Sequence, residues 1–214
     1  MASDTYPAQR ERSALCDLFV EVGPDAPTLC GDWTTRDLAA HLVVRERRPD
    51  AAIGIVFSKA AGYLDNVQAG VADTDWTELV DTVRSGPPAW SPTRIGAIDK
   101  AANTIEFFVH HEDVRRAGDT WEPRDLDADL TEALYAMLTK MAKRLVKSSP
   151  VGITFEPTDG SGPVTANEAE PSVTVRGAVG ELVLFAYGRQ SHSRVEIFGD
   201  DESIAAVSNA SFGI

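Results

Sequence analysis

Two histidines and one glutamate could bring metal chemistry to this chain. Only four histidines occur among the 214 residues, and two of them, His110 and His111, lie in the segment IEFFVHHEDVRR, which begins with an apolar run. Glu106 and His110 are four residues apart, so in a helix their side chains lie on one stripe. The same stripe passes through Asn103 and Asp113. The spacing therefore predicts a polar stripe on an otherwise buried helix.

A carboxylate and an imidazole buried together need solvent, a hydrogen-bond network or a cation, because burying them without partners costs roughly several kcal/mol. A divalent ion would take two ligands from Glu106 and His110 and a third from another helix. His41 is the candidate for the third ligand, since it lies beside Leu38 and Leu42 in DLAAHLVVRE, near the apolar side of its helix. Three protein ligands leave one coordination position open, which is typical of catalytic rather than structural zinc sites.

Simpler interpretations of the same residues stay open. A glutamate four residues before a histidine is also common as a salt-bridging helix face, and His41 alone could be a hydrogen-bonded core histidine. His111 points about a third of a turn away from His110, so we expect it to be a hydrogen-bonding neighbour rather than a ligand. Asp113 could support His110 by a hydrogen bond, or could face solvent at the helix end.

The elements that must position these residues follow from hydrophobic periodicity. Apolar residues that recur every three or four positions predict helices in the first two thirds of the chain. Thr34 followed by Asp37 indicates a capping box at the start of the second helix. The predicted helices span 8–22, 34 onward, 51–65, 76–83, 96–117 and 129–146.

After Pro150 the pattern changes to alternating apolar and polar residues. The segments VGITFEP, PSVTVRG and SRVEIFG are typical of half-buried strands, TDGSG of a hairpin turn, and VGELVLFAYGRQ of a short apolar helix. We therefore expect an α+β protein with two domains, a helical domain over 1–124 and a small α/β domain over 125–214.

Composition excludes several classes of protein. The formal net charge of −13, from 20 basic and 33 acidic residues, disfavours binding to nucleic acid or to anionic lipid. No apolar run reaches the ~18 residues of a membrane span, and the N-terminus lacks the apolar core of a signal peptide, so we expect a cytoplasmic protein.

Cys16 and Cys30 are expected to be core or boundary thiols, although a single disulfide between them stays open. Arg45, Arg47 and Arg48 are expected on a solvated helix face.

Three segments in this order, CGDWTTRDLAAHLVVRE, EFFVHHEDVRRA and VTVRGAVGELVLFAYGR, resemble the mycothiol-dependent maleylpyruvate isomerase family of the DinB-like metalloenzyme superfamily. The resemblance implies a DinB-like four-helix bundle followed by a small α/β domain. It also implies a divalent metal, usually zinc, held by His41, Glu106 and His110. In such proteins the thiol mycothiol is the cosubstrate, and its sulfur would occupy the open metal position as a thiolate. No substrate-binding residue of the isomerase can be matched here.

These observations predict a zinc-dependent transferase or isomerase that activates mycothiol for attack on a small electrophile. Arg189, which follows the apolar helix of the second domain, is a candidate for binding the cofactor. The alternative is a non-catalytic, metal-stabilised helical protein that binds a ligand or a partner, with the open position filled by water or by His111. The expected partners are a small-molecule thiol and an electrophilic substrate, with no nucleic acid and no membrane, and the oligomeric state is open.

Overall fold

The computed structural model describes residues 6–48, 61–88 and 96–213, with the backbone alone at Ala61 and at 96–102. The chain divides into two compact units, Met1–Trp121 and Glu122–Ile214; the sequence analysis places the division after Arg124. The described part of the first unit is helical, and the second combines helices with one sheet. The predicted α+β class is confirmed.

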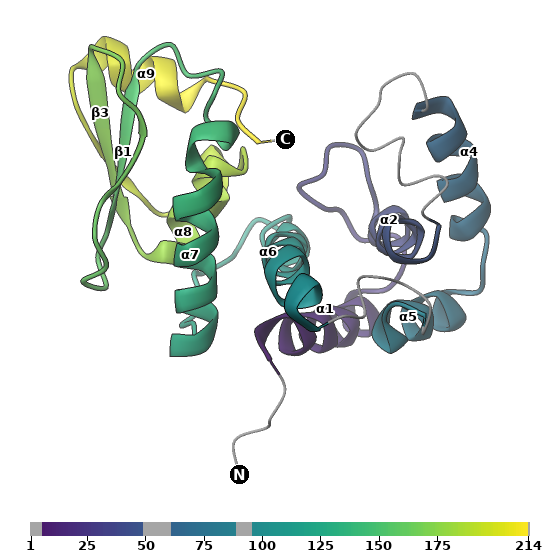
Figure 1. The fold of residues 1–214 in the computed structure, drawn as a ribbon. Coiled ribbons are helices and arrows are strands. Elements are labelled where there is room, and N and C mark those ends of the chain that lie inside the picture. The colour runs from purple at the N-terminus through teal and green to yellow at the C-terminus, as the bar shows by residue number, and fades with distance from the viewer. Residues whose placement is uncertain (1–5, 49–60, 89–95, 214) are drawn as a thin grey trace. The chain divides into compact units, whose positions relative to one another are not determined.

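The first unit consists of helices that pack in pairs (Figure 1). α1 packs against α5 and α6, and α2 packs against α4 and α5. The helices are α1 (Pro7–Val22), α2 (Thr35–Arg47), α4 (Ala61–Ala72), α5 (Trp76–Ser85) and α6 (Gly96–Arg115).

Apolar side chains from four of these helices form the core of the first unit. Phe19 of α1 lies edge-on to Trp76 of α5, with ring centroids 5.7 Å apart. Each fully buried aliphatic or aromatic side chain stabilises the fold by about 1.5 to 3 kcal/mol relative to exposure. The core therefore fixes how the helices face one another. Its fully buried members include Leu15, Phe19, Leu38, Leu42, Leu79 and Phe107.

α2 begins with the capping box that the sequence predicts. The Thr34 backbone N–H donates to Asp37 Oδ2 at 2.9 Å, and the Asp37 backbone N–H donates to Thr34 Oγ1 at 3.4 Å. This reciprocal pair satisfies two backbone donors that the first turn of a helix leaves without partners. The capping box also fixes the residue at which α2 starts. The start of α2 in turn determines that Leu38 and Leu42 face the core, and it determines the position of His41 on the helix.

The second unit contains a four-stranded sheet in the order β2-β1-β3-β4. β1 and β3 are parallel, and β2 and β4 pair antiparallel to them. α7 and α8 pack against each other and against the sheet, and α9 contacts β3. The elements are α7 (Ala128–Leu145), β1 (Gly152–Pro157), β2 (Val164–Asn167), β3 (Ser172–Gly177), α8 (Val179–Ala186), β4 (Glu196–Phe198) and α9 (Asp201–Ser208).

Three elements differ from the sequence analysis. β2 and α9 were not predicted: β2 has four residues, and α9 has eight, of which Ser203 and Val207 are buried. Residues 51–60 of the helix predicted over 51–65 lie outside the described residues, and α4 spans Ala61–Ala72. Short elements carry too few apolar positions for a period to be recognised.

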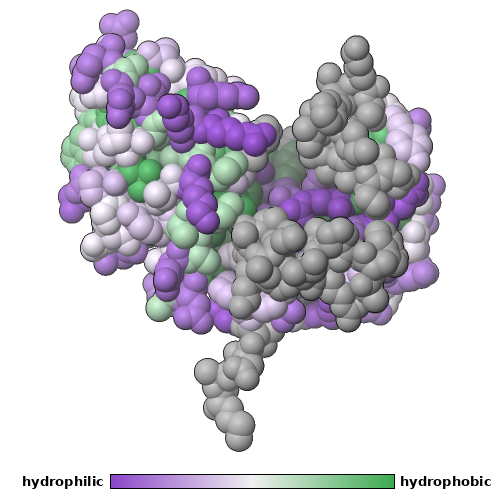
Figure 2. All heavy atoms as spheres, in the orientation of Figure 1, coloured by the Kyte–Doolittle hydropathy of each residue, from purple (hydrophilic) through white to green (hydrophobic). Residues whose placement is uncertain are grey.

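On the second unit, the face drawn in Figure 2 carries hydrophilic and intermediate side chains with hydrophobic side chains between them. Among the helices of the described residues, none combines the length and the apolar character that a bilayer crossing requires.

Candidate metal centre

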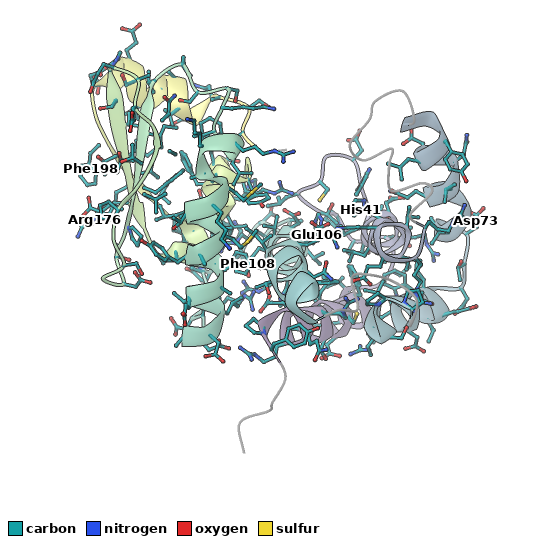
Figure 3. All side chains as sticks on the ribbon, viewed as in Figure 1. His41, Asp73, Glu106, Phe108, Arg176 and Phe198 are labelled. Atoms are coloured by element: carbon teal, nitrogen blue, oxygen red, sulfur yellow. The ribbon has the colours of Figure 1, made fainter. Side chains whose placement is uncertain are left out.

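Two helical stripes face each other in the first unit. His41 and Arg45 are one turn apart on α2, and Asn103, Glu106 and His110 follow one another at spacings of three and four on α6. Side chains at such spacings lie on the same side of a helix. Figure 3 shows His41 and Glu106 next to each other between the two helices. The polar stripe predicted on α6 therefore faces polar side chains of α2.

Both predicted histidine ligands point at one carboxylate oxygen. His41 Nε2 lies 3.5 Å, and His110 Nε2 3.4 Å, from Glu106 Oε1. The two imidazole rings meet edge-on, with centroids 5.6 Å apart. For zinc bonds of about 2.0 to 2.1 Å, the ligand atoms of a tetrahedron stand ~3.4 Å apart. The structure thus brings these three residues, which we call the candidate metal centre, to separations that fit one divalent ion.

The candidate metal centre is partly open to solvent. The His41 and His110 side chains are each 13% exposed, and that of Glu106 is 23% exposed. Among the described residues, no fourth histidine, cysteine, aspartate or glutamate joins these three ligand atoms. His111 faces α1 instead, where its Nδ1 lies 3.1 Å from Glu11 Oε2. The described donor set is therefore two imidazoles and one carboxylate, as the sequence analysis expects.

The second nitrogen of His110 is held by a buried carboxylate. His110 Nδ1 lies 3.0 Å from Asp113 Oδ2, and the Asp113 side chain is fully buried. Of the two interpretations left open for Asp113, the hydrogen bond to His110 is therefore confirmed and the solvent-facing position is wrong. The same oxygen accepts a hydrogen bond from Cys30 Sγ at 3.1 Å. Cys16 and Cys30 are both free thiols, and Cys30, unlike Cys16, lies beside this centre. No local pattern in the sequence indicates this role for Cys30.

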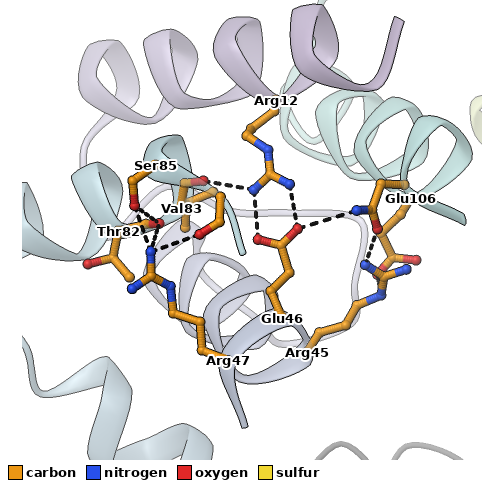
Figure 4. Close-up of polar contacts among 10 residues, drawn as sticks. Arg12, Arg45, Glu46, Arg47, Thr82, Val83, Ser85 and Glu106 are labelled. Atoms are coloured by element: carbon orange, nitrogen blue, oxygen red, sulfur yellow. Dashed lines mark hydrogen bonds and ion pairs between the residues drawn. The ribbon is translucent and has the colours of Figure 1, made fainter. Parts of the chain in front are cut away.

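A chain of buried polar contacts continues from Glu106 away from the candidate metal centre (Figure 4). Arg45 Nε lies 3.2 Å from Glu106 Oε1, and Arg45 Nη1 donates to Asn103 Oδ1 at 2.5 Å. The Asn103 amide donates to Glu46 at 3.5 Å, and Glu46 forms a buried, two-point ion pair with Arg12 of α1. The expectation that Arg45 lies on a solvated face is wrong, because its guanidinium is used to hold Glu106 and Asn103.

The titration of the centre follows from these contacts. Burial acts to raise the pKa of Glu106, but hydrogen bonds with His110 and His41 and the charges of His110 and Arg45 hold this pKa well below its usual value. Burial acts to lower the pKa of His110, but hydrogen bonds with Asp113, Cys30 and Glu106 raise it well above its usual value. Without an ion, a charged imidazole therefore faces a charged carboxylate.

Arg189 belongs to the second unit. It follows α8, is half-buried, and its Nη1 donates to the carbonyl of Tyr187 at 2.6 Å. The structure thus brings together His41, Glu106 and His110 within the first unit. A cofactor-binding role for Arg189 stays a prediction.

The chain thus consists of a helical unit in which two imidazoles and one carboxylate converge, followed by a small α+β unit. Residues 125–206, in the second unit, match the family model of the MDMPI C-terminal domain. The fold is similar to that of a mycothiol-dependent maleylpyruvate isomerase, with a TM-score of 0.60 and 16% identity over 90% of this chain and 91% of that one. A histidine-to-alanine mutant of a mycothiol-dependent maleylpyruvate isomerase gives a TM-score of 0.56 and 15% identity, again over 90% of this chain and 91% of that one.

No curated protein matches the chain. Identities of this size show a common fold and not a common reaction. The domain match and the fold together confirm the resemblance to the maleylpyruvate isomerase family that three segments of the sequence indicate.

Proposed function

We propose that the protein binds a divalent ion, most simply zinc, through His41, Glu106 and His110, and uses it to activate mycothiol for attack on a small electrophile. The convergence of both Nε2 atoms on Glu106 Oε1, at 3.5 and 3.4 Å, carries the metal part of the proposal. The thiol part is supported by the fold shared with a mycothiol-dependent isomerase and by the MDMPI C-terminal domain.

When bound, a divalent ion supplies positive charge that lowers the pKa of a thiol at its open position. Glu106 would contribute the single negative charge of the ligand set, and the neutral imidazoles of His41 and His110 would leave the centre net positive. The ring of Trp33, with its centroid 5.2 Å from that of His41, restricts the orientation of this imidazole. Arg45, whose Nε lies 3.2 Å from Glu106 Oε1, holds this carboxylate in place.

The reaction class is transfer of the thiol sulfur to an electrophilic carbon. In a conjugation, the thiol loses its proton, the sulfur–carbon bond forms, and the electrophile either loses its leaving group or gains a proton. In an isomerisation, the sulfur adds to a carbon of a double bond and leaves again after rotation about the resulting single bond. Both need a thiolate near neutral pH, and this is the requirement that a metal centre meets.

Metal analysis tests the first half of the proposal. Protein purified without added metal should contain a stoichiometric amount of a divalent ion by plasma mass spectrometry. His110→Ala should lose that ion while keeping the helical circular dichroism spectrum. His192→Ala, which alters a histidine of the second unit, is the matched control and should keep the ion. A folded wild type that takes up no zinc, cobalt or manganese would refute the proposal.

Calorimetry tests the second half. Mycothiol should bind the metal-containing protein and not the metal-depleted protein, and glutathione is the control thiol. Turnover should then be sought with maleylpyruvate and with chlorodinitrobenzene, which report isomerisation and conjugation respectively. If mycothiol binds equally well with and without metal, thiolate activation at this centre is excluded.

The alternative is a non-catalytic, metal-stabilised helical protein that binds a ligand or a partner. A helical protein without an ion is a third candidate, and Arg45 favours it, because a guanidinium 3.2 Å from Glu106 offsets the carboxylate charge. Both predict no change in mycothiol binding when the metal content is varied.

A further inference from the structure

Cys30 contacts the candidate metal centre through Asp113. We propose that Cys30 and Asp113 are positioning residues, which hold the His110 ring so that its Nε2 faces Glu106 and the ion. The proposal rests on the proposed function, because the ion is the one assigned there to His41, Glu106 and His110.

Both nitrogens of His110 have defined partners. Nδ1 lies 3.0 Å from Asp113 Oδ2, and Nε2 lies 3.4 Å from Glu106 Oε1. A carboxylate can only accept, so Nδ1 carries the hydrogen in this contact. A neutral imidazole that donates from Nδ1 keeps its lone pair on Nε2, the atom required for a metal bond. Asp113 thereby selects the tautomer that can bind the ion.

Cys30 in turn orients Asp113. The Asp113 side chain is fully buried, and Cys30 Sγ donates to the same Oδ2 from 3.1 Å. Cys30 belongs to the segment between α1 and α2, where its backbone N–H donates to Thr28 Oγ1 at 3.1 Å. The Leu29 backbone N–H donates to the carbonyl of Asp113 at 3.1 Å, so this segment holds Asp113 through both its backbone and its side chain.

Cys30, His110 Nδ1 and Asp113 could themselves be taken for ligands of an ion. The distances argue for hydrogen bonds instead. The contacts to Asp113 Oδ2, at 3.0 and 3.1 Å, are shorter than the ~3.3 to 3.5 Å that separates ligand atoms around zinc. They lie in the range of hydrogen bonds to a charged acceptor. The thiol is therefore a donor to the carboxylate in this arrangement.

Variants at Cys30 test the proposal through zinc affinity, measured by competition with a chromophoric chelator. Cys30→Ala and Cys30→Val remove the donor and should weaken zinc binding roughly two- to tenfold, the value of one hydrogen bond. Cys30→Ser keeps a donor and should bind within about twofold of the wild type. Asp113→Asn should weaken binding about 10- to 100-fold. Cys16→Ala, at a buried thiol of the same unit, is the control and should leave zinc affinity unchanged.

Nitrogen-15 NMR of the zinc-bound protein supplies a readout independent of activity. The wild type should show His110 with hydrogen on Nδ1 and metal on Nε2, and the Nδ1–H resonance should shift or broaden in Cys30→Ala but not in Cys30→Ser.

Equal zinc affinity of Cys30→Ala, Cys30→Val and the wild type would overturn the inference and leave the proposed function standing. A cobalt–thiolate charge-transfer band that is lost in Cys30→Ser would show that Cys30 is a ligand, which also overturns it. A wild type that binds no zinc refutes the proposed function itself.

Discussion

The ion pair between Arg12 and Glu46 is the most informative place to perturb the helical unit. Both side chains are almost completely buried, at 7% and 3% exposure, and Arg12 also donates to the carbonyl of Val83 at 2.8 Å and lies over the ring of Phe107. Glu46→Ala would leave a buried guanidinium without its carboxylate. Removing one partner of such a pair costs about 3 to 5 kcal/mol, so the free energy of unfolding of this unit should fall by that amount.

The effect can be measured in the first unit alone. All four tryptophans lie within the first 121 residues, so tryptophan fluorescence during urea unfolding reports on this unit and not on the second. With a denaturant dependence of about 2 kcal/mol/M, a loss of 3 to 5 kcal/mol lowers the urea midpoint by roughly 1.5 to 2.5 M.

The structure offers a matched control in a second ion pair that α1 makes. Arg84 and Asp17 join α5 to α1 at 2.8 Å, but their side chains are 36% and 69% exposed. Asp17→Ala should therefore cost less than about 1 kcal/mol. The double variant Arg12→Met with Glu46→Met should be clearly more stable than the sum of its single variants predicts, because it leaves no buried charge behind. If Glu46→Ala is no more destabilising than Asp17→Ala, the assignment of a buried, coupled ion pair is refuted.

Three further predictions follow from local chemistry. Thr34→Ala removes the capping box of α2 and should cost about 1 to 2 kcal/mol in urea unfolding, whereas Thr34→Ser should cost little. Burial raises the pKa of Cys16 from 9.0 to about 12, so the stabilising contribution of the protonated thiol is complete below pH 9 and is lost as the pH rises toward 12. Over this window the free energy of unfolding should therefore fall more steeply in the wild type than in Cys16→Ala. A native protein in which Cys16 reacts with a thiol reagent as fast as Cys30 does would contradict the raised pKa. Because the pKa of His110 is raised, a zinc ion must displace a proton from this imidazole when it binds. Zinc affinity should therefore increase with pH above 6.5, and calorimetry in buffers of different ionisation enthalpy should show proton release. An affinity that does not depend on pH would contradict the protonated state of His110.

The parts of the fold that the sequence predicts are those set by local interactions. The start of α2 was predicted because Thr34 and Asp37 are three residues apart and satisfy each other's backbone donors. The polar stripe of α6 was predicted because Glu106 and His110 are one turn apart. The start of α9 carried a comparable local signal, since the Asp200 side chain accepts from the Ser203 backbone N–H at 2.9 Å, and it was overlooked.

The residues that support the candidate metal centre could not be predicted from local patterns. Cys30 is 83 positions from Asp113, and Arg45 is 58 positions from Asn103, so each contact exists only once the helices are packed. Neither residue type indicates such a partner, because an arginine in a helix is most often solvated and a single cysteine is most often a small apolar group. β2 was missed for another reason: its four residues alternate only twice between buried and exposed positions.

The neighbouring histidines of α6 contact different parts of the first unit. His110 faces the candidate metal centre, whereas His111 binds Glu11 and so joins α6 to α1. Exchange of residue 110 for glutamine would therefore alter the candidate metal centre and keep the pairing of α1 with α6, whereas the same exchange at residue 111 would loosen this pairing first. One position along the helix thus separates a change at the candidate site from a change in the packing of the unit.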